Sequence, residues 1–113
     1  MLFRSEQIQI TTIYAAQVPL QVARMALAVM KLAFEAAQKG NLNTISDAAS
    51  GLFFAKSALT SAALNVRTNT LGIKDQSINQ NLLKDVQELE SESNALEKVT
   101  WQLLKDRGGF PIP

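Results

Sequence analysis

The chain has 113 residues, 47% of them apolar, and its 11 basic and 10 acidic residues give a formal net charge of +1. This length fits one domain or part of one, and the balanced charge argues against a nucleic-acid-binding protein. The absence of cysteine and histidine excludes disulfides, thiolate nucleophiles, and the commonest general base and metal ligand. Any chemistry must therefore use carboxylates, lysine, hydroxyl groups, amides or water, and we expect no metal site.

The N-terminal residues Met1–Ser5 read like the translated end of a widely used sequencing adaptor, taken from a GTG start. We expect them to be an assembly artefact fused to a truncated reading frame, unless genuine genomic sequence with a ribosome-binding site lies upstream. The next segment, Gln7–Gln17, is moderately apolar and is predicted to be a short N-terminal helical segment.

The first long helix is predicted to start at Pro19, whose missing N–H is harmless in a first turn, and to end at Gly40. Within it, Leu20–Gln38 is apolar apart from one narrow polar stripe, so the helix should be buried on most sides. Charged residues interrupt the apolar run and argue against a membrane span, and we expect no membrane partner. The polar stripe consists of Gln21, Arg24, Lys31, Glu35 and Gln38.

The second long helix is predicted to follow a tight connection at Asn41–Ile45. Ser46 is the expected N-cap, and the helix should run to about Thr70, with Gly72 closing the block. Many of its residues are small, which lets neighbouring helix axes approach closely.

The third long helix is predicted to begin near Ser77, whose spacing to Gln80 matches a capping box. Its apolar residues recur by fours and threes as in a coiled-coil seam, with Ser93 at one expected apolar position. Its other faces are charged, so it should lie at the surface and present one face to the bundle. The seam residues are Ile78, Leu82, Val86, Leu89, Leu96, Val99 and Leu103, and the helix should be stopped by Gly108, Gly109, Pro111 and Pro113.

These elements predict an all-α fold, a bundle of three long helices plus the short N-terminal helical segment. Two partner helices cannot cover a helix that is apolar almost all round. The bundle therefore looks incomplete, and we expect it to be completed by a missing N-terminal half or by dimerisation.

Three segments stand out, in this order: Ala15–Ala23 (AAQVPLQVA), Lys39–Asp47 (KGNLNTISD) and Ala62–Asn69 (AALNVRTN). They resemble the cyclodeaminase/cyclohydrolase family, which includes the deaminase domain of formiminotransferase-cyclodeaminase and free-standing methenyltetrahydrofolate cyclohydrolases. The resemblance implies that residues 1–113 are the C-terminal part of a single domain. Members carry an upstream half with a glycine-serine-rich segment, and nothing like it occurs in this sequence.

The resemblance implies a role in folate one-carbon metabolism, as a formiminotetrahydrofolate cyclodeaminase or a methenyltetrahydrofolate cyclohydrolase. It implies no cofactor beyond the tetrahydrofolate derivative that is the substrate, a homodimer or higher homo-oligomer, and a cytoplasmic location. The alternative is a non-catalytic helical oligomerisation module that uses the seam between Ile78 and Leu103.

The candidate catalytic residue is Asp47, a carboxylate that could act as general base or electrostatic partner in either folate reaction. The other interpretation of Asp47 is a first-turn carboxylate that interacts only with exposed N–H groups and the helix dipole. Asp47 and Asn65 share a helix face but lie about 27 Å apart along the axis. They cannot line one small site within a single helix, so they serve different regions unless a symmetry mate brings opposite ends together.

The candidate substrate-binding residues are four amides and one cation. The amides could also be structural, two holding the connecting loop and two linking helices, because a buried amide must find a partner in backbone or ligand. The cation could attract the anionic glutamate tail of a folate or be an ordinary solvated surface charge. These residues are Asn41, Asn43, Asn65, Asn69 and Arg67.

Overall fold

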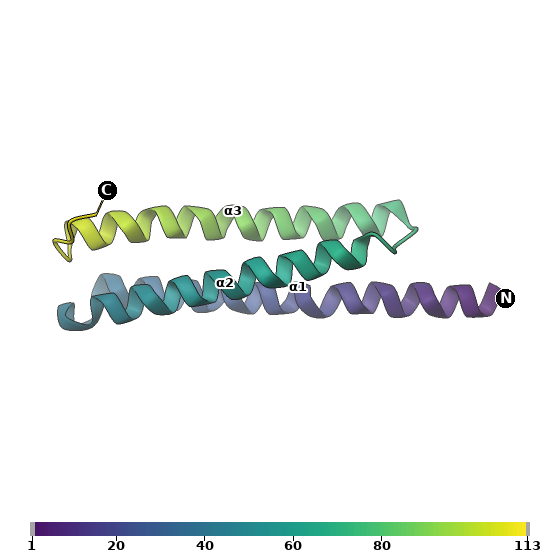
Figure 1. Cartoon of the computed structure of the whole chain (residues 1–113), viewed down its shortest axis with the longest axis horizontal. Coiled ribbons are helices and arrows are strands. Elements are labelled where there is room, and N and C mark those ends of the chain that lie inside the picture. Colours follow the sequence, from purple (N-terminus) through teal and green to yellow (C-terminus); the bar gives the residue numbers. More distant parts are fainter. Residues whose placement is uncertain (1, 113) are drawn as a thin grey trace.

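The fold consists of three long helices, each antiparallel to the next along the chain (Figure 1). The computed structural model describes residues 2–112. In chain order the elements are α1 (Leu2–Lys39), the short 3-10 helix η1 (Leu42–Thr44), α2 (Ile45–Thr70) and α3 (Gln76–Asp106). This part of the chain contains no strand, so the all-α prediction is confirmed. Two residues named in the sequence analysis lie outside the described residues. They are Met1, from the predicted adaptor-like segment, and Pro113, from the predicted helix stop.

The segment Gln7–Gln17 is helical as predicted, but it is part of helix α1, which is continuous from Leu2 to Lys39. The predicted start of the long helix at Pro19 is therefore wrong. An interior proline lacks the N–H that would bond to the carbonyl four residues earlier, here that of Ala15. The side-chain amide of Asn69 donates to this carbonyl at 3.2 Å and to the carbonyl of Asn65 at 2.9 Å. A side chain of α2 thus supplies the donor that the proline removes.

Helix α1 buries one stripe of side chains rather than most of its surface, in contrast to the sequence prediction. Large apolar residues on the opposite side are 45–68% exposed and recur by fours and threes. We call this set, Tyr14, Val18, Val22, Met25, Val29 and Leu32, the outer stripe of α1. The buried stripe consists of Ala16, Leu20, Ala23, Ala26, Leu27, Met30 and Ala37.

Helix α2 starts directly from η1, without the predicted Ser46 cap. The Asn41 side-chain oxygen accepts a bond from the Asn43 amide at 2.9 Å, and the turn runs on into the helix at Ile45. The N-cap position is Thr44, which makes no side-chain capping bond. Ser46 is already helical because η1 begins the helical path earlier than the sequence indicated.

Helix α3 is capped by Asp75 rather than by Ser77. Its carboxylate accepts a hydrogen bond from the Ile78 amide at 3.1 Å, which satisfies a first-turn N–H group. The Asn79 side chain then donates to the carbonyls of Thr70 and Ile73 at the end of α2. Both ends of the α2–α3 connection are therefore held by side chains.

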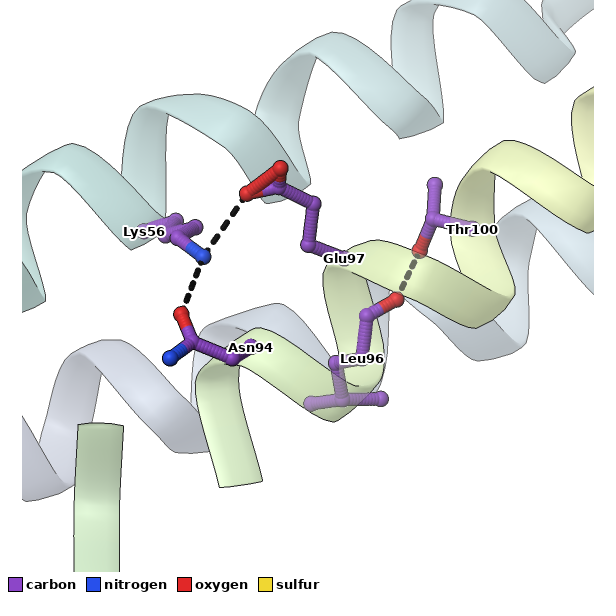
Figure 2. Close-up of polar contacts among 5 residues, drawn as sticks. All are labelled: Lys56, Asn94, Leu96, Glu97 and Thr100. Carbon is purple, nitrogen blue, oxygen red and sulfur yellow. Dashed lines mark hydrogen bonds and ion pairs between the residues drawn. The ribbon is translucent and has the colours of Figure 1, made fainter. Parts of the chain in front are cut away.

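The seam of α3 packs against α1 and α2 with regular spacing by fours and threes. Ser93 is buried at the position predicted for it, but Thr100, not Val99, continues the seam, and Val99 is 45% exposed. The Thr100 hydroxyl donates to the Leu96 carbonyl at 2.7 Å, which satisfies its polar group (Figure 2). Thr100 lies seven residues after Ser93, about two helical turns, and therefore on the same face of α3. Position on this face decides which residue is buried, although valine is more apolar than threonine.

The far end of the bundle is closed by the segment after α3. Gly109 has a φ of +68°, and the Phe110 amide reaches back to the Leu104 carbonyl at 3.1 Å, so the predicted glycine stop is confirmed. The Arg107 guanidinium donates to the carbonyls of Ala37 and Gly40 at the end of α1. These contacts hold the C-terminus of α1 beside the end of α3.

The charged residues in the middle parts of α1 and α2 face α3. Between residues 7 and 34, and again between 48 and 70, the sequence has only two charged residues each, all four of them basic. Each forms an ion pair with a carboxylate of α3, so the opposite face of the α1–α2 layer carries no charge over these ranges. The pairs are Arg24–Asp85 at 3.3 Å, Lys31–Glu92 at 3.6 Å, Lys56–Glu97 at 2.7 Å and Arg67–Glu90 at 2.5 Å.

One helix, over Phe3–Lys39, is long and apolar enough to cross a membrane by length and composition alone. Core helices of soluble proteins pass the same test, and 39% of the most apolar window of this helix is buried inside the bundle. Two of its cations, Arg24 and Lys31, pair with α3.

We expect the Asn69 amide and Pro19 to be energetically coupled. Asn69→Ala should lower the free energy of unfolding by about 1 kcal/mol, because the Ala15 carbonyl loses its donor. In a Pro19→Ala background the loss should be smaller, since residue 19 then supplies its own N–H. Chemical denaturation of the two single variants and the double variant measures this coupling. Asn65→Ala is the matched control and should be additive with Pro19→Ala; additivity for Asn69→Ala would contradict the proposed bond.

Candidate functional site

The predicted site residues lie in three separate places. Asn41, Asn43 and Asp47 are exposed at the end of the bundle where α1 meets α2. Asn65 and Asn69 lie in the second half of α2, on the side away from α3. Arg67 points to α3 instead. The structure therefore brings together two pairs of the predicted amides, but it does not bring Asp47 to Asn65 within one chain.

A groove between α1 and α2 holds the second pair of amides. Its volume is about 510 Å³, within the range of small-molecule sites, and its walls are mostly apolar. No charged side chain lines the groove, and its polar groups are the side chains of Ser61, Asn65 and Asn69. We call it the α1–α2 groove; it is lined by Ala15, Val18, Pro19, Val22, Ala58, Ser61, Ala62, Asn65 and Asn69.

The position of Asn69 in this groove depends on the interior proline. Its Nδ2 atom is engaged by the carbonyls of Ala15 and Asn65, which holds the amide group in one orientation. Its side-chain oxygen can therefore act as an acceptor of fixed direction. Asn65 is exposed one turn away and can offer both a donor and an acceptor.

A second groove, about 700 Å³, lies between α1 and α3 on the other side of the outer stripe. It shares Val18 and Val22 with the first groove, but it also contains Tyr14 and the ion pair between Arg24 and Asp85. The outer stripe of α1 thus forms a ridge between an uncharged groove and a charged one.

Arg67 is held by Glu90 through two hydrogen bonds, 2.9 Å from Nη1 and 2.5 Å from Nη2. The guanidinium hydrogen bond lowers the pKa of Glu90, and the same contact raises the pKa of Arg67. An anionic folate tail would have to displace Glu90 before it could bind to Arg67.

A polar cluster that the sequence analysis did not single out joins α2 to α3. The Lys56 ammonium donates to the Asn94 side-chain oxygen at 2.7 Å and pairs with Glu97 at the same distance (Figure 2). The hydrogen bond from Lys56 is the main cause that lowers the pKa of Glu97, with a smaller contribution from Trp101. The Trp101 ring also packs against Phe53, with centroids 4.9 Å apart. The sequence signal for this cluster is the i,i+3 spacing of Asn94 and Glu97, which places both side chains on the same face of α3.

Asp47 occupies the first turn of α2. As an exposed carboxylate it can accept a proton from water or face a cation. Within residues 2–112 no group of three or more acidic residues could hold a metal ion.

The chain is similar in sequence to known proteins of folate metabolism. The family model of formiminotransferase-cyclodeaminase matches residues 2–88. The chain is also 38% identical over 104 residues to a methenyltetrahydrofolate cyclohydrolase of Methylorubrum extorquens. That match covers 92% of this chain and 50% of the relative, so the chain spans about half the length of the protein it resembles.

The α3 carboxylates should make the bundle sensitive to acid. Because the pKa values of Glu90 and Glu97 are lowered in the folded state, their contribution to stability is present above the unfolded-state pKa and is lost as pH falls through the lowered values. Thermal unfolding followed from neutral pH to pH 3 should show a flatter acid limb for the variant Glu90→Gln/Glu97→Gln. Glu88→Gln, which removes a carboxylate outside these pairs, should keep the wild-type slope. An unchanged acid limb in the double variant would contradict the assignment.

Proposed function

The chain belongs to the formiminotransferase-cyclodeaminase family, and we propose that it is part of an enzyme that acts on a one-carbon derivative of tetrahydrofolate. The observation that carries this proposal is the 38% identity to a methenyltetrahydrofolate cyclohydrolase over nearly the whole chain. We favour hydrolysis of the methenyl bridge over deamination for the same reason. A purely non-catalytic helical module is not favoured, because the match to the family model covers residues 2–88, about three quarters of the sequence.

In this proposal the chain is the C-terminal part of one domain, and the remainder completes the bundle. The outer stripe of α1 supports this, since its large side chains are exposed at heptad spacing in the isolated chain. Helices from the rest of the domain would bury them. The enzyme would work in the cytoplasm, with no cofactor beyond the folate itself.

The α1–α2 groove fits the proposed substrate chemically. The pterin ring of a folate is flat and carries hydrogen-bonding groups along its edge, which the amides of Asn65 and Asn69 can match. The methenyl bridge is cationic, and a groove without basic residues does not repel it. In hydrolysis a water molecule adds to this carbon and loses one proton. One carbon–nitrogen bond of the bridge then breaks, its nitrogen takes the remaining hydroxyl proton, and a formyl group is left on the other nitrogen.

Asp47 is the proposed general base for that step. Because it lies at the other end of α2 from Asn69, it would reach the bridge only in a site that the rest of the enzyme or another copy completes. A carboxylate can take the proton from the attacking water and stabilise the cationic bridge before attack. Asn41 and Asn43 shape the loop that leads into the first turn of α2, where Asp47 lies. They are proposed to contact the substrate next to Asp47. Arg67 would bind the glutamate tail only by exchanging Glu90 for the ligand carboxylate.

The activity test measures consumption of methenyltetrahydrofolate by the chain alone and by the chain co-expressed with the part of the Methylorubrum relative outside the matched residues. We expect turnover in the co-expressed sample and little in the chain alone, because half of the domain is proposed to be missing. Release of ammonia from formiminotetrahydrofolate, measured in parallel, would instead indicate a deaminase. Folded protein without folate binding in either sample would overturn the proposal.

Asp47→Asn should lower turnover at least about 100-fold in the active sample, the usual range for loss of a general base, while the melting temperature stays nearly unchanged. Glu88→Gln, another exposed carboxylate, is the matched control and should retain full activity. A large loss of stability with preserved turnover would show that the Asp47 carboxylate is structural.

A further inference from the structure

Two hollows lie between α2 and α3, next to the α1–α2 groove. The first has a volume of about 450 Å³ and shares Ser61 with that groove, and the second, about 400 Å³, shares Lys56 and Glu97 with the first. The three depressions therefore follow one another across the exposed face of α2, and we call this series the α2 track. Besides the shared residues, the first hollow is lined by Phe53, Ser57 and Thr60, and the second by Asn94, Lys98 and Trp101.

The surface of α2 is low where the track crosses it. Phe54 and Leu64, which are 77% and 59% exposed, stand on either side of the crossing along the helix. The exposed residues between these two are Ser57, Ala58, Thr60 and Ser61. All four side chains are small, so a flat or extended group can lie across the helix at this level. The hydroxyl groups among them can donate or accept hydrogen bonds along the way.

The α3 end of the track carries one cation in excess. Figure 2 shows Lys56 reaching from α2 to Asn94 and Glu97, and the Glu97 carboxylate balances its charge. Lys98, at the edge of the same hollow, is exposed and has no ion-pair partner within residues 2–112. The Trp101 ring packs against Phe53 but stays 43% exposed. This end of the track therefore offers an unpaired ammonium group beside an accessible aromatic surface.

The other way out of the α1–α2 groove crosses the outer stripe of α1. Val18 and Val22 line both that groove and the α1–α3 groove, so the ridge between the two is made of large apolar side chains. Beyond the ridge, Arg24 is paired with Asp85 and leaves no cation in excess. A ligand with a ring at the amides of the α1–α2 groove and an anionic end is therefore better matched by the α2 track.

We propose that the α2 track binds the p-aminobenzoylglutamate part of the folate, with the glutamate carboxylates beside Lys98. This inference rests on the proposed function, which places the pterin ring at Asn65 and Asn69. Lys56 lies nine residues before Asn65, about 14 Å along α2, and an extended aminobenzoyl ring with its amide and glutamate spans a comparable length. The benzoyl ring crosses α2 above the small residues, and the Trp101 indole covers the glutamate methylene groups.

This arrangement gives the glutamate tail a cation that is free to bind it. Arg67 is held by Glu90 through two hydrogen bonds, whereas no carboxylate of the described residues pairs with Lys98. Lys98 therefore attracts the tail without first losing an internal ion pair. We assign it the role of a specificity-determining residue that selects ligands with an anionic end.

The α3 end of the track can be tested without enzyme activity, because the chain contains a single tryptophan. In a nitrogen–proton correlation spectrum of the full chain, p-aminobenzoylglutamate should shift the Trp101 indole N–H signal saturably. Lys98→Glu should weaken this binding at least about 5-fold, the upper end for one exposed ion pair, and Lys98→Arg should preserve it. Lys84→Glu, at another exposed lysine of α3, is the matched control and should bind like the wild type. No saturable shift, or equal weakening by the control, would overturn the proposal.

The connection between the α1–α2 groove and the α3 end is tested with folinic acid, a stable formyl derivative of tetrahydrofolate. It should shift the Asn69 side-chain amide signal and the Trp101 indole signal together, with one saturation curve. Ser57→Leu fills the middle of the track and should weaken this binding about 10-fold, the expected scale for a steric clash. Ser50→Leu makes the same change at an exposed serine of α2 outside the track and should have no effect. Separate saturation of the two signals, or equal effects of the two variants, would overturn the track.

Turnover separates failure of this inference from failure of the proposed function. In the active co-expressed sample, Lys98→Glu should raise KM for methenyltetrahydrofolate at least about 5-fold and leave kcat within about 2-fold, because the tail is held equally in the ground state and the transition state. Lys84→Glu should change neither constant. Binding of p-aminobenzoylglutamate without any turnover would support the track and count against the folate reaction alone. Turnover with a KM that does not respond to Lys98→Glu would overturn the track and leave the proposed function standing.

Discussion

The separation of charge across the α1–α2 layer is the constraint on which the rest of the structure depends. Four cations on this layer face four carboxylates on α3, and the opposite face has no charged residue along its middle. Because opposite charges attract, this distribution favours packing of α3 on the side of the layer that carries the four cations. It also leaves an uncharged surface of apolar and small side chains, where the α1–α2 groove is found.

A second constraint acts within that uncharged surface. Proline in the middle of a helix leaves one carbonyl without a donor, and here a side chain of the neighbouring helix supplies it. The bond ties α1 to α2 and holds the Asn69 amide in a fixed orientation. The structural demand of Pro19 and the chemical character of the groove are therefore two consequences of one interaction.

The residues proposed for catalysis and for substrate binding lie at opposite ends of α2. This separation has a simple explanation if function needs more protein than one copy of the chain, since the chain spans about half of its relative. The outer stripe of α1 offers the remainder of the domain an exposed apolar surface.

The sequence by itself determined the helical class, the turns near Gly40 and Gly72, the glycine stop after α3 and the seam residue Ser93, because these follow from local periodicity and from residues with special backbone properties. It also indicated the family and the distance that separates Asp47 from Asn65. It did not determine that α1 continues through Pro19, that Thr100 replaces Val99, or that Arg67 is occupied by Glu90. Those outcomes required the tertiary structure, because in each case the deciding partner is a group on another helix or the packing register between helices, and neither is visible in local sequence.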